Sequence, residues 1–257
     1  GSPFIVQELL EGEDLARYVE RRGGRLTASE VAEFLLPVVD AVAEAHERGV
    51  VHRDLKPENV FLARIGNRLV PKLLDFGISK LRLPNIKLTE IGTMMGTPAY
   101  MAPEQVQGSR DADPRADVWA LGVMLFELIS GRLPFDAEDA PALFVAIATK
   151  DAPPLVEIHP DAGADVSRIV GRCLRRLPDD RYASALELAR DLRDVFGGEI
   201  VVGSEPRSAP RSSPFEVPDL ILPARSHARD GGPRAAPTRS GPPPAVPMPV
   251  PAASGPH

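Results

Sequence analysis

The sequence predicts a mainly α-helical fold, with a short strand and small hairpins beside the helices. Two observations carry this prediction. Apolar residues recur at spacings of three and four between residues 31 and 45, the period of a helix with one buried face. A second stretch, 118–129, is apolar nearly all round, which is typical of a central buried helix. The remaining elements follow from local capping and turn signals.

The first part of the chain predicts one strand and one short helix. Phe4, Ile5 and Val6 form a short apolar run that predicts a buried strand leading into residues 8–10. A helix is expected over residues 14–22, and the glycine pair at 23–24 ends it.

The long helix begins at a capping box. Thr27 and Glu30 have the spacing at which each side chain satisfies a backbone N–H group of the other residue. The helical period then continues to just before Gly49. Beyond it, two short apolar runs between residues 60 and 74 flank Gly66-Asn67, which predicts a hairpin.

The second half of the chain predicts four more helices. The apolar helix 118–129 follows Asp117 and stops at Gly131. The others are expected at about 141–149, 165–176 and 184–196, the last of them opening with the capping box Ser184–Glu187.

Composition divides the chain near residue 198. Residues 199–257 are rich in Pro, Ala, Ser, Arg and Gly, and hold about half of the 28 prolines. Such a segment cannot bury enough apolar surface to offset its ordering entropy, so we expect a disordered tail or linker. Pro244 and Pro247 form a PxxP pattern that can dock an aromatic groove, so the tail is also a candidate recruiting segment.

Overall charge and cysteine content exclude several classes of protein. A net charge of −6 argues against a general affinity for nucleic acid or for an anionic membrane. The single cysteine, Cys173, excludes an internal disulfide and a cysteine-cluster metal site. No run of 18 apolar residues and no signal peptide is visible, so we expect a cytoplasmic location and no membrane span in this chain.

Two polar clusters have the composition that phosphoryl transfer requires. The first follows the long helix directly and reads His52-Arg53-Asp54-Leu55-Lys56-Pro57-Glu58-Asn59, and the second is Asp75-Phe76-Gly77. Phosphoryl transfer needs a carboxylate for the attacking hydroxyl, oxygen ligands for Mg²⁺ and a cation near the moving phosphate. Asp54 can be the base and Lys56 the cation. Asn59 and Asp75 can hold Mg²⁺, which takes few protein ligands.

These clusters, followed by Ala102-Pro103-Glu104, occur in the order found in protein kinases, and the sequence resembles the bacterial kinases of the eukaryotic type. The resemblance covers about residues 1–197. It implies a partial kinase domain over residues 1–198, consisting of the hinge and the helical C-terminal lobe. The fold class would become α+β if the small lobe were counted.

The resemblance also implies individual roles. Lys56 resembles the lysine of serine/threonine kinases, and Thr97 the threonine of the loop that receives the substrate hydroxyl. His52 is expected to order the catalytic loop by packing, and Asp117 to brace its backbone. Glu104 and Arg181 would form a buried ion pair between the activation segment and the late helices.

For ATP, the resemblance implies contacts near the start of the chain. Glu8 and Leu10 would meet the adenine through the hinge backbone, with Asp14 at the ribose and Phe61 beneath the adenine. Arg53 resembles the arginine that pairs with a phosphorylated activation loop, for which Thr89 and Thr93 are the candidates. Another molecule of the kinase is expected to transfer that phosphate from ATP.

Three parts of a working kinase are not found in the sequence: a glycine-rich loop, a strand lysine and the glutamate that pairs with it. We therefore expect this chain alone to be inactive, although the gene product would phosphorylate Ser and Thr of protein substrates. The alternative is a non-catalytic kinase-like scaffold that recruits partners through the proline-rich tail. A small-molecule kinase is disfavoured by the 96–104 segment and Arg181.

Overall fold

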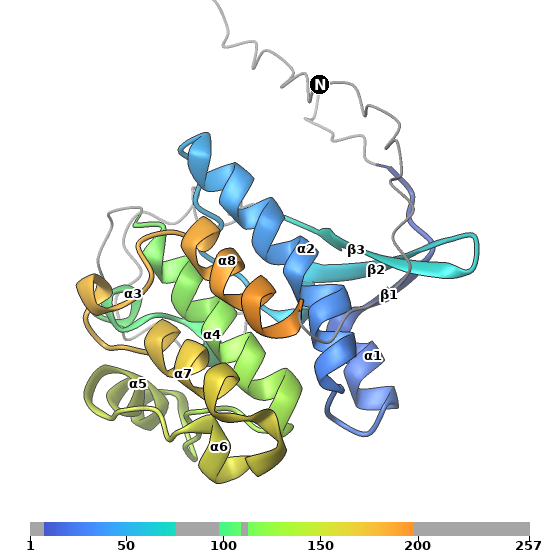
Figure 1. Cartoon of the computed structure of the whole chain (residues 1–257). Coiled ribbons are helices and arrows are strands. Elements are labelled where there is room, and N and C mark those ends of the chain that lie inside the picture. The colour runs from blue at the N-terminus through green and yellow to red at the C-terminus, as the bar shows by residue number, and fades with distance from the viewer. Residues whose placement is uncertain (1–7, 76–97, 109–112, 198–257) are drawn as a thin grey trace, which may run out of the picture. The chain divides into compact units, whose positions relative to one another are not determined.

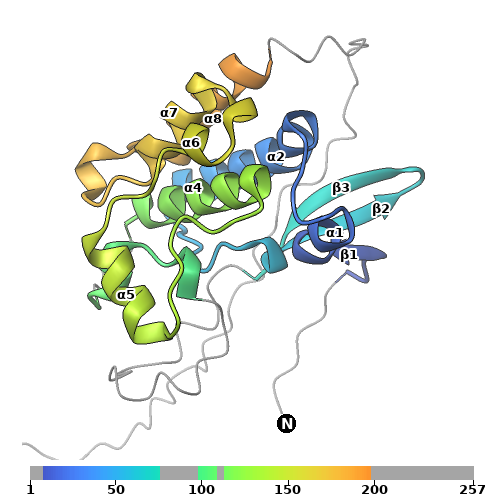
Figure 2. The ribbon, with the colours of Figure 1, turned by 90° about the horizontal axis from the view of Figure 1, so that it is seen from below.

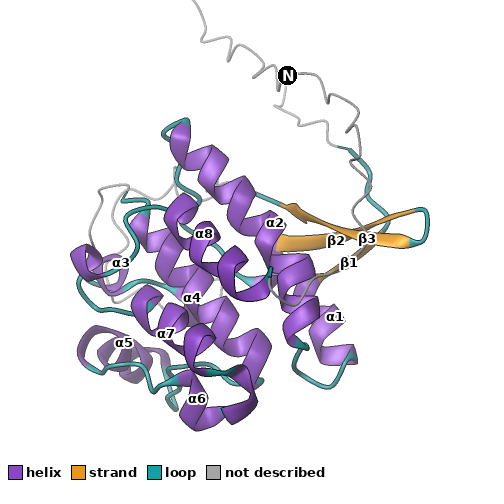
Figure 3. Cartoon of the chain, viewed as in Figure 1, coloured by secondary structure: helices purple, strands orange, loops and turns teal. Residues whose placement is uncertain are grey.

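The structure is a computed structural model, and it describes residues 8–75, 98–108 and 113–197. Helices dominate this part of the chain, and its strands form one sheet (Figure 3). The helices are α1 (Leu15–Arg21), α2 (Ala28–Glu47), α3 (Pro103–Val106), α4 (Arg115–Ser130), α5 (Ala140–Thr149), α6 (Leu155–Ile158), α7 (Ala164–Cys173) and α8 (Ala185–Phe196). The strands are β1 (Gly12–Asp14), β2 (Val60–Ile65) and β3 (Arg68–Leu73), paired antiparallel in the order β1-β2-β3. The predicted mainly helical fold is confirmed.

Helices α2 and α4 form the centre of the helical part. Helix α8 lies along α2, and α7 packs against α4 (Figure 1). The sheet and α1 lie at one side of this pair, and α5 lies at the opposite side (Figure 2). The contact between α4 and α7 is close at Gly122, where an added Cβ would lie 2.4 Å from the Cβ of Cys173. Only glycine fits that crossing without displacing a helix.

Helix α2 begins and ends where the sequence predicts. Thr27 Oγ1 accepts from the backbone N–H of Glu30 at 3.3 Å, and Thr27 N donates to Glu30 Oε2 at 3.0 Å, which completes the capping box. Gly49 has a φ of 74° just after the helix end. The buried face of α2 carries the apolar residues whose spacing predicted the helix, among them Val31, Leu35 and Val39.

Helix α4 is buried almost all round, as its composition predicts, and Gly131 ends it with a φ of 72°. It begins three residues earlier than expected, so Asp117 lies inside the first turn and not before it. In contrast, α7 ends at Cys173, three residues short of the predicted end. Beyond this end, the carbonyl groups of Arg175 and Arg176 accept from the Arg181 guanidinium.

The hairpin around Gly66-Asn67 is confirmed as β2 and β3. Strand β1 was not predicted, because its three residues show no alternation of apolar and polar side chains. Gly12 opens it with a φ of 148°, and an added Cβ there would lie 2.0 Å from the carbonyl oxygen of Leu62. The strand predicted at residues 4–6 and the tail at 199–257 lie outside the described residues.

Candidate functional site

The loop between α2 and β2 brings the three predicted catalytic residues together. It ends in a 3-10 turn over Pro57–Asn59. Asn59 Nδ2 donates to the backbone carbonyl of Asp54 at 2.6 Å and lies 3.3 Å from Asp54 Oδ2. Lys56 Nζ lies 3.6 Å from the same carboxylate oxygen. The Asp54 side chain is 36% exposed, so a substrate hydroxyl can reach it. We refer to residues 52–59 below as the catalytic loop.

Asp75 lies beside this loop. The backbone N–H of Leu74 donates to the carbonyl of Asn59 at 2.8 Å, which fixes the end of β3 next to the asparagine. Asp75 has a φ of 51°, a conformation that is uncommon for residues other than glycine, and its side chain is exposed. Within the described residues, Asn59 Oδ1 and the Asp75 carboxylate accept no hydrogen bond. Carboxylate and amide oxygens of this kind are the ligands that Mg²⁺ prefers, so the two residues fit the ion.

Asp117 holds the backbone at the start of the catalytic loop. Its two carboxylate oxygens accept from the N–H groups of His52 at 2.8 Å and Arg53 at 2.7 Å, and the residue is 1% exposed. Arg53 has a φ of 66°, so the loop adopts a strained turn one residue before Asp54. Hydrogen bonds to a buried carboxylate are charge-assisted and can maintain such a turn.

His52 is buried and connects the catalytic loop to the strand that leads to Asp75. Its Nε2 lies 2.9 Å from the carbonyl oxygen of Leu74, which can only accept, so Nε2 carries the hydrogen. Its Nδ1 accepts from the N–H of Asp54, at a long 3.4 Å. Both ring nitrogens are used in loop contacts, which agrees with the packing role expected from the sequence.

His46, at the end of α2, is a further part of this network that motif reasoning does not reveal. Its Nε2 donates to Asp117 Oδ2 at 2.9 Å, and the side chain is 6% exposed. The two residues are 71 positions apart, so no local pattern connects them. The only sequence feature that could have indicated this contact is a histidine in the last turn of the helix that precedes the catalytic loop.

Glu104 and Arg181 form the ion pair that the resemblance implied. The guanidinium donates to both carboxylate oxygens, at 2.7 and 2.8 Å, and the Arg181 side chain is fully buried. It also lies over the ring of Trp119, with 5.0 Å from Cζ to the centroid. Its remaining donors bind three backbone carbonyls, those of Arg115, Arg175 and Arg176. This side chain therefore joins α3, α4 and the segment after α7.

Tyr100 and Glu127 form a second partly buried pair that the sequence did not indicate. The Tyr100 hydroxyl donates to Glu127 Oε2 at 2.6 Å. Burial raises the pKa of Tyr100, and the Glu127 carboxylate adds to the effect. Burial also raises the pKa of Glu127, the Tyr100 hydrogen bond opposes this, and the nearby Glu58 reinforces it. The pair places a titratable carboxylate between α4 and the segment that ends in α3.

The raised pKa of Glu127 predicts that Glu127→Gln changes how the melting temperature depends on pH. A carboxyl group with a raised folded-state pKa stabilises the fold below its unfolded-state pKa, and that contribution is lost as the pH rises through the folded-state pKa. Glutamine does not titrate and can still accept from Tyr100. The melting temperature of the variant relative to wild type should therefore be higher at about pH 8 than at about pH 4. Glu138→Gln, at an exposed position, is the control, and equal pH dependence of both variants would contradict the prediction.

The residues expected at the nucleotide lie along β1, β2 and the segment before them. Phe61 pairs with Asp14 across the sheet. The Asp14 carboxylate accepts from the N–H of Arg17 at 2.9 Å and so caps α1. Glu8 Oε2 lies 2.6 Å from Lys72 Nζ on β3, and Leu10 is half-buried. Lys72 in turn pairs with Phe61, so Asp14, Phe61 and the partner of Glu8 lie in register across the three strands. The contacts of these residues to ATP stay predictions.

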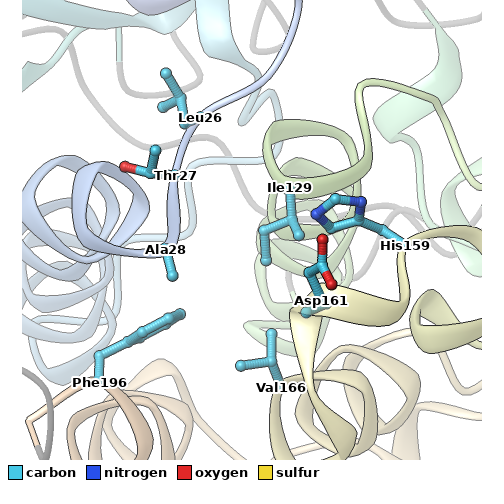
Figure 4. Close-up of a pocket in the computed structure, with 9 residues that line it drawn as sticks. Leu26, Thr27, Ala28, Ile129, His159, Asp161, Val166 and Phe196 are labelled. Carbon is cyan, nitrogen blue, oxygen red and sulfur yellow. The ribbon is translucent and has the colours of Figure 1, made fainter.

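The three threonines Thr89, Thr93 and Thr97, together with Phe76 and Gly77, lie outside the described residues. A cavity of about 220 Å³ lies elsewhere, between the start of α2 and the ends of α4 and α8 (Figure 4). Its lining includes Ile129, Val166 and Phe196 but none of the predicted site residues. Ile129 follows Asp117 by twelve helical residues, roughly 18 Å along α4, so this cavity is separate from the catalytic loop.

Comparisons with known proteins identify the family. The family model described as "Protein kinase domain" matches residues 2–191. The chain is 45% identical to the serine/threonine-protein kinase Pkn1 of Myxococcus xanthus over 203 residues, covering 79% of this chain and 29% of that protein. It is 38% identical to PkaA of Streptomyces coelicolor, covering 90% of this chain and 41% of PkaA. For PknL of Mycobacterium tuberculosis the identity is 35%, with 82% and 51% covered.

The chain thus spans between about a third and a half of the length of these curated relatives. Within the described ranges, no helix is both long enough and apolar enough to cross a membrane. The matched region includes the catalytic loop, Asp75, the Glu104–Arg181 pair and every described helix up to the first part of α8. The chain belongs to the protein kinase family, and it is of the bacterial, eukaryotic-like serine/threonine type.

Proposed function

We propose that the protein containing this chain transfers the γ-phosphate of ATP to serine and threonine hydroxyls of proteins. The observation that supports this most directly is the grouping of Asp54, Lys56 and Asn59, with Asp75 beside them. A scaffold would require none of these side chains in this arrangement. Lys56, two residues after Asp54, favours a serine or threonine as the acceptor.

In the proposed reaction, Asp54 orients the acceptor hydroxyl and takes its proton as the oxygen attacks the γ-phosphorus. Lys56, within 3.6 Å of that carboxylate, is placed to stabilise negative charge on the moving phosphoryl group. Asn59 and Asp75 would hold Mg²⁺, which neutralises charge on the phosphates when it is bound. Positioning and electrostatics supply most of the catalysis in such a reaction.

Two finer proposals concern the activity of the chain and its control. We propose that this chain, without a glycine-rich loop and strand lysine, transfers phosphate poorly or not at all by itself. Phosphorylation of Thr89 or Thr93 by a second kinase molecule would add a charge that can pair with Arg53. Phosphopeptide mass spectrometry of active protein checks the second proposal, and bare threonines at both positions would contradict it.

The decisive experiment compares two preparations. One is the chain as printed, and the other is a fusion in which a small lobe with a glycine-rich loop and strand lysine precedes residue 4. Each is incubated with Mg²⁺, γ-labelled ATP and a generic Ser/Thr-rich protein acceptor, and labelled products are analysed for phosphoserine, phosphothreonine and phosphotyrosine. We expect label on serine and threonine with the fusion only. A folded fusion that binds ATP and transfers nothing would favour the scaffold alternative.

A further inference from the structure

Gln105, in the four-residue helix α3, makes two hydrogen bonds that serve different purposes. Its Oε1 accepts from the backbone N–H of Ala102 at 2.9 Å, which caps the start of α3. Its Nε2 donates to the backbone carbonyl of Arg53 at 3.1 Å, across 52 positions of sequence. The first bond is local and stabilises the helix end. The second connects α3 to the catalytic loop one residue before Asp54.

The group that Gln105 binds is the strained peptide of the catalytic loop. Arg53 has a φ of 66°, and its N–H is already held by Asp117 Oδ1 at 2.7 Å. The Gln105 bond adds a contact to the carbonyl of the same residue. The N–H lies in the 52–53 peptide and the carbonyl in the 53–54 peptide, so Asp117 of α4 and Gln105 of α3 hold the two peptides on either side of the Arg53 Cα. Such strained conformations persist only where the surroundings hold them.

Helix α3 is a firm support for this bond. The residue before Gln105 is Glu104, whose carboxylate is held by two hydrogen bonds from the buried Arg181. A short helix would be a poor anchor alone, but this one is fixed to α4 and to the segment after α7 through that guanidinium. The Gln105 side chain therefore transmits the position of α3 to the loop that carries Asp54.

We infer that Gln105 is a positioning residue for phosphoryl transfer, acting through the Arg53 carbonyl on the placement of Asp54. This inference rests on the proposed kinase function for its catalytic consequence, but not for its structural part. Without the Nε2 donor, the 53–54 peptide can rotate while the helix, the ion pair and the fold stay intact. Displacing a reacting group by about 1 Å can lower the rate roughly 100-fold.

Gln105→Glu separates the two bonds. Glutamate keeps the acceptor for Ala102 but has no donor for the Arg53 carbonyl. Gln107→Glu is the matched control, because it places the same charge two residues away at an exposed position on the C-cap of α3. Gln105→Met, which is neutral and lacks the donor, tests whether the added charge alone is responsible.

Hydrogen exchange of the chain as printed is the first measurement, and it needs no enzymatic activity. We expect peptides over residues 50–58 to exchange roughly 2–10-fold faster in Gln105→Glu and Gln105→Met, as for the loss of one hydrogen bond. The exchange rates of peptides from α2 and α8 should equal those of wild type. The melting temperature of Gln105→Glu should also equal that of wild type. Exchange at 50–58 equal to that of Gln107→Glu would overturn the inference. Faster exchange throughout the lobe would also overturn it, since that indicates a general structural role.

In a preparation that transfers phosphate, kcat of Gln105→Glu should fall roughly 10–100-fold, with KM for ATP unchanged. An unchanged kcat would overturn the catalytic part of the inference. If the wild-type fusion folds and binds ATP but transfers nothing, the proposed function fails, and the exchange experiment on the printed chain still decides whether Gln105 positions the loop.

Discussion

Asp54→Asn should lower kcat for phosphate transfer by roughly 10²–10⁴-fold, the usual contribution of a positioned general base. Asparagine has the same shape and still offers an oxygen to Asn59, 3.3 Å away, so the loop should keep its structure. It cannot take a proton from the substrate hydroxyl. Since the nucleotide is not expected to contact Asp54, KM for ATP should change little. Initial rates at saturating ATP in the active fusion measure the effect.

Asp136→Asn is the control for this variant, because it makes the same chemical change at an exposed position. The melting temperature of both variants should equal that of wild type, which separates loss of chemistry from loss of fold. Equal kcat in wild type and Asp54→Asn would rule out the role given to Asp54. A fall in kcat together with a large fall in melting temperature would instead indicate that Asp54 supports the loop.

Local signals in the sequence predicted most of the helical part. The Thr27–Glu30 capping box and Gly49 defined α2, because helix ends depend on groups within three or four residues. The same holds at α8, with a difference in detail. The Ser184 hydroxyl accepts from the backbone N–H of Glu187 as expected. The Glu187 carboxylate, however, accepts from the backbone N–H of Ala183 and not from that of Ser184.

Motif order also predicted which side chains meet in the catalytic loop, since Asp54, Lys56 and Asn59 lie within six residues. The contacts that the sequence did not reveal join distant positions. Tyr100 and Glu127 are 27 residues apart, and His46 and Asp117 are 71 apart. No periodicity or spacing encodes such pairs, because they depend on how the helices are placed in three dimensions. The predicted end of α7 was three residues too late, because the first helix-ending residue after Cys173 is Pro178 and no local signal marks the end at Cys173.

Arg181→Met should strongly destabilise the fold. The Arg181 side chain is fully buried and donates to Glu104 and to three backbone carbonyls. Removing one partner of such a pair typically costs about 3–5 kcal/mol, because the other charge and the carbonyls stay buried without a donor. For a domain of this size, each kcal/mol lowers the melting temperature by roughly 2–4 °C. Thermal unfolding should therefore begin roughly 6–20 °C lower.

Arg168→Met is the matched control, because Arg168 is 58% exposed and its nearest carboxylate oxygen lies 3.6 Å away. An exposed pair of this kind contributes about 0–1 kcal/mol, so the control should unfold close to wild type. Glu104→Gln combined with Arg181→Met should cost less than the sum of the two single changes, since the second change no longer leaves a charge unpaired. Strict additivity, or equal melting temperatures for Arg168→Met and Arg181→Met, would show that the ion pair does not hold α3 in place. Gln105 would then have no fixed support from which to position the catalytic loop.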